Sequence, residues 1–419
     1  MKKIKLLVLS DHMFSPSGVG TQTRYVMESL LDTGDYSIRY LGGAIKHENY
    51  TPVKTDKYGD DLIIYPVDGY GSPEIVRSIL RTERPDMVWF MTDPRFWDWL
   101  WEIEDEIRSL VPMVYYHVWD NYPLPDYNEP YYSSNDVIAA ISKVTHDIVQ
   151  KVSPGVESHY IPHAVDPEVF FPLSDEEIEK FKNDHMPDSK DKFIVFWNNR
   201  NARRKLPGSL IHYFNEFLDK VGRDKAQLIM HTDPFDPHGP NLEALLHKFD
   251  LVNGEAKLST AKVEPQQLSM MYNVADVTIN ISDAEGFGLA TLESLSCGTP
   301  IIVNMTGGLQ EQVTDGENWF GVGIQPAAKA MIGSQQIPYI FEDRVSGDDV
   351  VEALTDMYEN REKLKEMGAA GRNHVVENYN FKDFCKKWDD LLKSIHDRYG
   401  SWETRNHYKR WELLEVKND

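Results

Sequence analysis

Cysteine is scarce in this chain, since Cys297 and Cys385 are the only two among 419 residues. This scarcity argues against a disulfide framework and favours a reducing compartment. Long apolar runs are also missing, and no stretch approaches the ~20 residues that a membrane-spanning helix needs. The apolar stretch near the start runs only from Leu6 to Leu9, which we interpret as a first buried strand and not as a signal peptide. These absences predict a cytoplasmic protein without a transmembrane segment.

Basic residues are in deficit, because 44 lysines and arginines face 67 aspartates and glutamates, for a net charge of -23. The deficit is not confined to one half, since residues 1–165 also hold more acidic than basic side chains. Proteins that read nucleic acids normally present a basic surface. We therefore do not expect a nucleic acid among the partners.

Short apolar runs alternate with longer amphipathic segments along the whole chain. This alternation predicts an α/β protein with parallel sheets that helices cover on both faces. We expect strands at Ile4–Leu9, Asp86–Met91, Val111–Tyr116, Val137–Ile141, Phe193–Trp197, Gln227–His231, Asp276–Asn280 and Ile301–Asn304. We expect helices at Thr21–Leu31, Pro207–Val221, Leu242–Phe249, Pro265–Val274 and Leu289–Ser296.

The length suits two domains better than one core. The alternating pattern restarts after a linker rich in proline, Ile161–Pro167, so we predict domains over residues 1–165 and 166–380. Two such Rossmann-like domains would face each other across a cleft. Ligands of parallel sheets bind where the carboxyl ends of the strands and their loops gather.

The segment Ser282–Pro300 carries the strongest chemical signal. It reads as a strand end, a loop with Gly286 and Gly288, and a helix whose first N–H groups favour an anion. Two carboxylates frame this loop, Glu285 at its mouth and Glu293 one turn into the helix. The residues of this segment that we predict to bind the ligand are Ser282, Glu285, Gly286, Phe287, Gly288, Leu289 and Glu293.

Positive charge is concentrated directly after the first strand of the second domain. Arg200, Arg203, Arg204 and Lys205 form the densest basic cluster of an acidic chain. Such a cluster suits a ligand with two phosphates, because bidentate and charge-assisted contacts hold phosphate oxygens well.

Three weaker signals lie elsewhere. Ser17–Gly20 is a glycine loop before a helix, but Thr23 stands at the third glycine position of a dinucleotide motif, which argues against a dinucleotide site. Many aromatic residues surround His117 and could form a groove for sugar rings or pack in the core. The segment 230–238 holds His231, Asp233, Asp236 and His238, yet its prolines favour a shaped turn over a metal site.

Taken together, these motifs closely resemble the retaining glycosyltransferases of family 4, which have the GT-B fold. Ser282–Pro300 resembles their Glu-x7-Glu signature, and Gly307–Glu311 their Gly-Gly-x-x-Glu loop. Tyr272–Asp276 is similar to their Tyr-x-x-Ala-Asp, and Ile161–Phe170 to their interdomain segment. His163 and Ala164 depart from the usual Asn-Gly there, and Asn199 replaces the glycine before the first arginine.

The resemblance assigns roles that the residues alone do not. It implies that Arg200 and Lys205 grip the donor diphosphate, that Glu285 holds the donor sugar, and that Glu293 holds the ribose. It places His117 near the transferred sugar, with a catalytic role, and Gly18 and Gly20 at the donor. It also implies chemistry without a metal or other cofactor, and C-terminal helices over residues 381–419 that return to the first domain.

The predicted function is therefore transfer of a sugar from a UDP-, GDP- or ADP-sugar to an acceptor hydroxyl with retained configuration. The acceptor would be a glycan, a lipid-linked sugar or a small molecule. A viral-type transferase acting on DNA bases, and a hydrolase or epimerase of nucleotide sugars with the same fold, stay open as alternatives. A third alternative, a binding protein without activity, fits poorly because both carboxylates are present.

Overall fold

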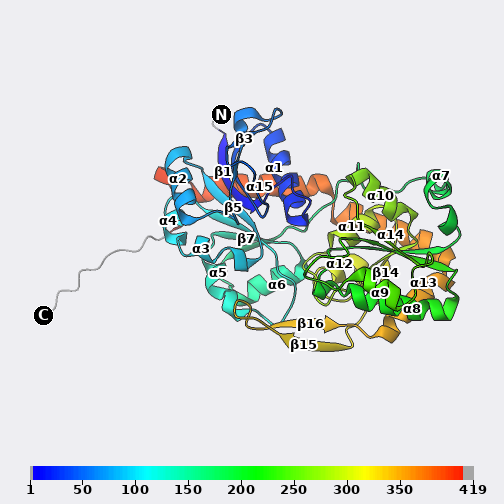
Figure 1. The fold of residues 1–419 in the computed structure, drawn as a ribbon. Helices are drawn as coiled ribbons and strands as arrows, with labels where there is room; N and C mark the ends of the chain where they lie inside the picture. Colours follow the sequence, from blue (N-terminus) through cyan, green and yellow to red (C-terminus); the bar gives the residue numbers. More distant parts are fainter. Residues whose placement is uncertain (1–2, 409–419) are drawn as a thin grey trace.

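The computed structural model describes residues 3–408, which form two α/β lobes side by side (Figure 1). The first lobe is built on an eight-stranded sheet in the order β3-β4-β2-β1-β5-β6-β7-β8. Its strands are parallel except for the β3–β4 pair. The strands are β1 (Ile4–Asp11), β2 (Tyr36–Gly43), β3 (Val53–Lys54), β4 (Leu62–Pro66), β5 (Met87–Thr92), β6 (Met113–His117), β7 (Val137–Ala140) and β8 (Glu157–Tyr160).

The longer helices of this lobe cover the sheet because each carries an apolar stripe and a capped start. The side chains of Ser17, Ser72 and Ser142 cap the first, second and sixth helices by accepting a hydrogen bond from a backbone N–H of the first turn. The helices of the first lobe are α1 (Gly18–Asp32), α2 (Pro73–Glu83), α3 (Asp98–Trp101), α4 (Glu104–Arg108), α5 (Glu129–Ser133) and α6 (Lys143–Val152).

The second lobe holds a six-stranded parallel sheet in the order β11-β10-β9-β12-β13-β14. Its strands are β9 (Phe193–Asn198), β10 (Ala226–His231), β11 (Ala256–Ser259), β12 (Val277–Asn280), β13 (Ile301–Asn304) and β14 (Gly321–Ile324). Its helices are α7 (Asp175–His185), α8 (Pro207–Val221), α9 (Leu242–Lys248), α10 (Pro265–Val274), α11 (Leu289–Ser296), α12 (Leu309–Val313), α13 (Gly347–Glu359) and α14 (Leu364–Asn378). The strands and helices expected between residues 4 and 304 are all present, within a few residues of their expected ends.

An antiparallel hairpin follows the second sheet, formed by β15 (Ala328–Ile332) and β16 (Ile340–Arg344). It lies along the lower edge of the molecule, beneath the space between the lobes (Figure 1). The sequence analysis did not anticipate it.

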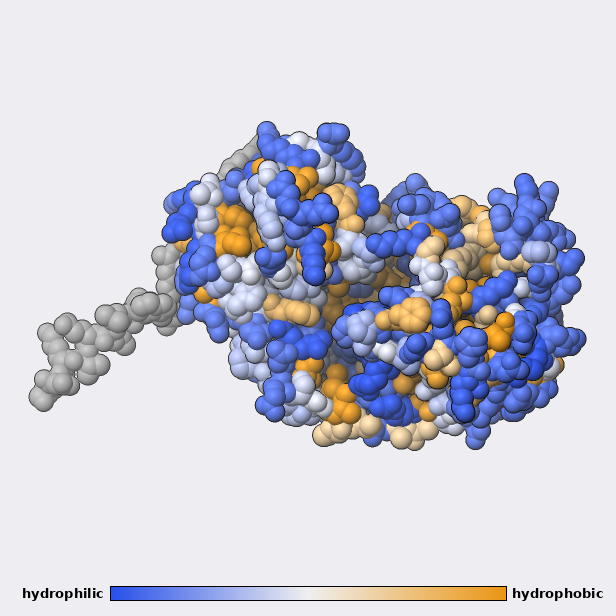
Figure 2. Space-filling view, viewed as in Figure 1, coloured by the Kyte–Doolittle hydropathy of each residue, from blue (hydrophilic) through white to orange (hydrophobic). Residues whose placement is uncertain are grey.

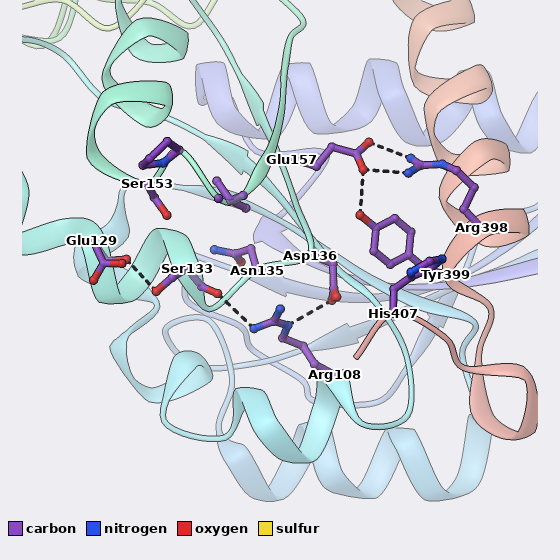
Figure 3. Close-up of a pocket in the computed structure, with 13 residues that line it drawn as sticks. Arg108, Glu129, Ser133, Asn135, Asp136, Ser153, Glu157, Arg398, Tyr399 and His407 are labelled. Atoms are coloured by element: carbon purple, nitrogen blue, oxygen red, sulfur yellow. Dashed lines mark hydrogen bonds and ion pairs between the residues drawn. The ribbon is translucent and has the colours of Figure 1, made fainter. Parts of the chain in front are cut away.

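The last helix, α15 (Phe381–Tyr399), belongs in space to the first lobe. It packs against α1, and the rings of Trp388 and Trp89 lie 5.6 Å apart. Near its end the Arg398 guanidinium pairs with Glu157 at 2.7 Å, and the Tyr399 hydroxyl donates to the same carboxylate (Figure 3). After Tyr399 the structure has only a 3₁₀ turn, Trp402–Thr404, so the helix expected from Tyr399 toward Trp411 is wrong for the described part. Residues 409–419 lie outside the described residues.

The surface is mostly hydrophilic on the face shown in Figure 2, and apolar residues gather in the hollow between the lobes. Among residues 3–408, no helix is both long enough and apolar enough to cross a membrane.

Candidate active site between the lobes

The loop from β12 to α11 forms the floor of the candidate site. Gly288 ends this loop with a φ of +90°, and a Cβ there would lie 2.5 Å from the Leu309 side chain, so only glycine fits without strain. No side chain caps α11, which begins at the next residue, Leu289. The first N–H groups of the helix therefore have no acceptor within it and can bind an anion.

Glu285 lies in this loop as a buried carboxylate with cationic partners. The Lys205 ammonium contacts its Oε2 directly, Asn280 Nδ2 donates to the same oxygen at 3.3 Å, and Arg204 NH1 lies 4.0 Å from Oε1. Burial on its own would raise the pKa of Glu285, but Lys205 and Arg204 outweigh it and lower the pKa. The carboxylate is therefore ionised and held in one position.

Lys205 and Arg204 reach this point from a 3₁₀ turn, Arg203–Lys205, that directly follows β9. Lys205 is buried, and Arg204 NH1 also donates to the Ala284 carbonyl at 2.6 Å. Both cations are thus held against the loop that carries Glu285.

Arg200 lies apart from this cluster. Its guanidinium pairs with Asp236 at 2.6 Å and contacts His238 Nδ1 at 2.7 Å, and 60% of its side chain is exposed. The structure therefore places Arg204, and not Arg200, beside Lys205 and Glu285. The sequence did not predict this grouping, because the partners of Arg200 lie on another loop.

The histidines and aspartates of the 230–238 loop are engaged in local contacts, and Asp233 accepts a hydrogen bond from the Phe235 N–H at 2.9 Å. Asp236 and His238 bind Arg200, and His231 Nδ1 lies 2.9 Å from the Ser259 hydroxyl. In the part of the chain that the structure describes, no group of three or more His, Cys, Asp or Glu side chains could hold a metal ion.

The first lobe closes the site with its glycine loop and with one carboxylate. A Cβ on Gly18 would lie 2.9 Å from Leu289 Cδ1, so the first residue of α1 approaches the start of α11 closely. Gly20, two residues on, donates its N–H to the capping Ser17 hydroxyl at 2.9 Å. A Cβ on Gly286 would lie 2.9 Å from Asp120 Oδ1, so this carboxylate of the first lobe faces the Glu285 loop.

Asp120 was missed by the sequence analysis. Burial is the largest influence on this carboxyl, and it raises the pKa of Asp120 although the nearby Arg204 lowers it. Its position shortly after β6, where loops of a parallel sheet carry ligands, is the only signal that the sequence offered.

Glu293 occupies a separate position on α11. It accepts a hydrogen bond from the Tyr272 hydroxyl at 2.6 Å, and Asn198 Nδ2 donates to that hydroxyl at 2.8 Å. Burial raises the pKa of Glu293 to about 7, against the lowering effect of Tyr272. The two glutamates therefore differ in charge near neutral pH, since Glu285 has cations beside it and Glu293 has a phenol.

Two further predicted residues have structural contacts in the loop. The Ser282 hydroxyl donates to Asn280 Oδ1 at 2.5 Å, which fixes the turn after β12. Phe287 is buried, with its ring 4.9 Å from that of His163.

His117 lies away from the cluster. It is fully buried, with Nδ1 3.0 Å from the Tyr115 hydroxyl and Nε2 2.8 Å from the Tyr132 hydroxyl. Burial lowers its pKa to about 3, so the ring is neutral. The structure thus gives this histidine two phenol partners in the core and no opening toward the cleft. The aromatic residues around it divide: Trp89, Trp97, Tyr115, Tyr116 and Tyr132 are core, whereas Trp119, Tyr127 and Tyr131 line a cavity.

A larger cavity, of about 540 Å³, lies at the amino ends of β7 and β8, on the opposite edge of the sheet from the cleft. Figure 3 shows its charged side chains turned toward one another, Arg398 to Glu157 and Arg108 to Asp136. Each pair is therefore neutral, and the Arg398–Glu157 pair binds α15 to the first lobe.

Two parallel α/β lobes with a final helix on the first lobe define the GT-B fold, and comparison with solved structures confirms it. Sucrose-phosphate synthase from Thermosynechococcus elongatus superposes with a TM-score of 0.73 at 14% identity, covering 94% of this chain and 100% of that one. Anabaena HepE in complex with UDP-glucose gives a TM-score of 0.68 at 14% identity, covering 93% and 99%.

Residues 177–374 match the family model of the glycosyl transferases group 1. The match covers most of the second lobe, which holds the motifs that indicated a glycosyltransferase. The D-inositol 3-phosphate glycosyltransferase of Acidothermus cellulolyticus is 35% identical over 139 residues, which are 30% of this chain and 31% of that relative. The match thus spans about a third of the curated relative's length.

Proposed function

We propose that this chain is a retaining, metal-independent glycosyltransferase of family 4 that uses a nucleoside-diphosphate sugar as donor. The observation that supports this most is the Glu285 carboxylate, buried against Lys205 and Arg204 at the free N-terminus of α11. A carboxylate for sugar hydroxyls and cations for a diphosphate stand side by side there, in a domain of the glycosyl transferases group 1.

In the proposed reaction the donor diphosphate binds to Lys205, to Arg204 and to the first N–H groups of α11. When the bond from the sugar C1 to the diphosphate breaks, negative charge grows on the leaving oxygen. Preorganised donors of this kind are each worth ~2.7–4 kcal/mol of barrier. Lys205 and Arg204 would supply the positive charge that a metal ion supplies in other transferases.

The remaining residues position the two substrates. Glu285 would accept hydrogen bonds from hydroxyls of the donor sugar, and Glu293 from the ribose. The acceptor hydroxyl would attack C1 from the face that the diphosphate leaves, and its proton would pass to the departing diphosphate oxygen. Closure of the lobes, with Gly18 against Leu289, would exclude the water that otherwise hydrolyses the donor.

The donor test is a screen of UDP-, GDP- and ADP-sugars with mass spectrometry of the products. A structural neighbour binds UDP-glucose, so UDP-glucose is the first donor to try. Transfer of the sugar to an added acceptor supports the proposal. Release of free sugar at the same rate with and without acceptors would favour the hydrolase alternative instead. The surplus of acidic side chains weighs against DNA as acceptor, since phosphate contacts dominate such binding.

A further inference from the structure

The hairpin β15–β16 belongs to the second lobe in sequence but is bound to the first. Tyr127 donates its hydroxyl to the Tyr339 carbonyl at 2.9 Å, and their rings lie 4.9 Å apart. The Phe341 N–H donates to the Tyr122 carbonyl at 2.7 Å, and Asn121 Nδ2 donates to the Phe341 carbonyl at 3.0 Å. The hairpin turn is therefore held over the loops that follow the strands of the first sheet.

The base of the same hairpin is bound to the Glu285 loop, which runs from β12 to α11. The Asp343 N–H donates to the Asp283 carbonyl at 2.8 Å, and the Arg344 guanidinium pairs with the Asp283 carboxylate at 3.1 Å. Asp283 lies two residues before Glu285, so the hairpin connects the candidate active site to the first lobe.

A cavity of about 290 Å³ lies between the hairpin turn and the first lobe. This volume is close to the lower end of the range that small-molecule sites have. Three aromatic side chains and three amides line it: Trp119, Tyr127, Tyr131, Asn128, Gln335 and Gln336. Aromatic faces bind the apolar faces of a sugar ring, and each amide offers both donors and acceptors to hydroxyls.

This cavity lies next to the candidate active site. Trp119 lines the cavity, and its carbonyl oxygen would lie 3.1 Å from a Cβ on Gly286. Arg95 also lines it and is close enough to Asp120 for that carboxylate to help raise the pKa of Arg95, although its own partner Asp93 has the larger effect. A ligand in the cavity would therefore lie close to Asp120 and to the Glu285 loop, although no residue of that loop lines the cavity.

The charges at the cavity do not suit an anionic ligand. Arg95 is the one cationic side chain that lines it, among the described residues, and Asp93 neutralises it with contacts at 2.8 and 3.0 Å. Asp98, exposed on the rim, has no ion-pair partner within residues 3–408. The rim therefore carries a net negative charge and would repel a phosphate or a sugar acid.

We propose that this cavity is the acceptor subsite, that the hairpin turn completes it, and that it takes an uncharged sugar ring. The proposal rests on the glycosyltransferase function proposed above. It assigns Gln335 and Gln336 of the second lobe to acceptor recognition, together with the aromatic residues of the first lobe.

The test measures binding of sugars by saturation-transfer NMR in the presence of UDP. The probes are the methyl glycosides of glucose, galactose, mannose and N-acetylglucosamine, with glucose 6-phosphate as the charged counterpart. We expect at least one neutral glycoside to bind and glucose 6-phosphate to bind at least tenfold more weakly. The double variant Gln335→Ala/Gln336→Ala should weaken the neutral glycoside at least tenfold and leave the affinity for UDP unchanged.

Two further variants make the result decisive. Gln266→Ala, at an exposed glutamine of α10, is the matched control and should change nothing. Asp98→Lys should improve binding of glucose 6-phosphate several-fold, because it reverses the charge of the rim. The proposal is overturned if no neutral glycoside binds, if glucose 6-phosphate binds better to the unmodified protein, or if the glutamine variant binds as the control does.

Failure of the proposed function has a different signature. In that case no nucleotide sugar is turned over by the unmodified protein, whatever the glycosides do in the NMR measurement. If the protein turns over a donor but the glutamine variant binds glycosides as well as the unmodified protein does, the proposed function holds and only the acceptor subsite is wrong.

Discussion

Glu285 and Lys205 are buried against each other, so each is the counter-charge of the other until a donor arrives. Glu285→Gln removes the charge and keeps the shape. We expect affinity for the free nucleoside diphosphate to stay equal or rise, because Lys205 is released for the phosphates. Transfer should fall at least 100-fold, or ~2.7 kcal/mol in barrier. Calorimetric titration and single-turnover transfer measure the two effects, with exposed Glu243→Gln as control. Transfer at the unmodified rate would show that the carboxylate is structural.

The cations Arg200, Arg204 and Lys205 should differ in effect. Lys205→Ala and Arg204→Ala remove charges fixed beside the Glu285 loop, so both should weaken binding of the nucleoside diphosphate and slow turnover at least tenfold. Arg200→Ala should have a smaller effect on both, because Asp236 and His238 already hold that guanidinium. Titrations of the three variants with the same nucleotide rank them directly. If Arg200 ranks first, its observed pairing does not persist with the donor bound.

Glu293 makes the stability of the protein depend on pH. Its pKa is about 7 in the folded state, against ~4.3 for an ordinary glutamate. Between these values the folded protein binds more protons than the unfolded chain, so this group lowers stability as the pH rises. Glu293→Gln avoids the ionisation and should stabilise the protein by about 1–3 kcal/mol at pH 8. At pH 4.5 it should have little effect. Urea unfolding at both pH values, beside Glu243→Gln, tests this, and an equal effect at both would contradict it.

At the scale of elements, the turn into α11 depends on the backbone of Gly288. Gly288→Ala adds the ~1 kcal/mol of a left-handed backbone and a clash with Leu309 at 2.5 Å. Gly34→Ala is the matched control, because Gly34 also has a positive φ but has open space where its Cβ would be. We expect Gly288→Ala to lose more stability than Gly34→Ala in urea unfolding, and also to lose nucleotide binding. Equal losses would mean that the loop shifts freely, and the anion site at α11 would not be preformed.

The elements that the sequence predicted are those with a strong local pattern. β9 and β10 are continuous apolar runs bounded by polar turns, and α8 has an apolar stripe with proline at its start. β2 was missed because Arg39 interrupts its apolar pattern, and only the fold brings the Glu83 carboxylate to this arginine, at 2.6 Å. The hairpin was missed because only Glu342 and Asp343 of it are buried and its partners lie on the other lobe.

The same reason limits what could be predicted of the site. The Glu285 loop and α11 are contiguous in sequence, so their arrangement follows from a strand, a glycine turn and a helix. The choice between Arg200 and Arg204 depends on Asp236, 36 positions away from Arg200 on another loop. The burial of His117 depends on Tyr132, which follows in a separate helix. Contacts between residues far apart in the sequence determine both the position of these arginines and the burial of His117, and a local sequence pattern does not reveal such contacts.

At the scale of the whole molecule, the proposed function requires an acidic chain to bind a doubly charged diphosphate. It concentrates two cations and a helix N-terminus at one point, where a ligand would otherwise meet a repulsive surface. If these groups replace a metal ion, binding should be independent of divalent cations. We expect a nucleoside diphosphate at 100 times its Kd to stabilise the protein by ~2.7 kcal/mol. The rise in melting temperature should be the same in EDTA and in magnesium or manganese.

The control for this measurement is the loop that the sequence offered as a rival metal site. His231→Ala and His238→Ala should leave the nucleotide-induced rise in melting temperature unchanged in either buffer, because those histidines bind Ser259 and Arg200. A rise that requires magnesium or manganese would contradict the metal-free proposal. If that requirement also disappeared in His238→Ala, the 230–238 loop would be the metal site, and Arg200 would be its regulator rather than a donor contact. A rise unchanged by EDTA but lost in Lys205→Ala would instead support the cationic cluster as the group that takes the place of a metal.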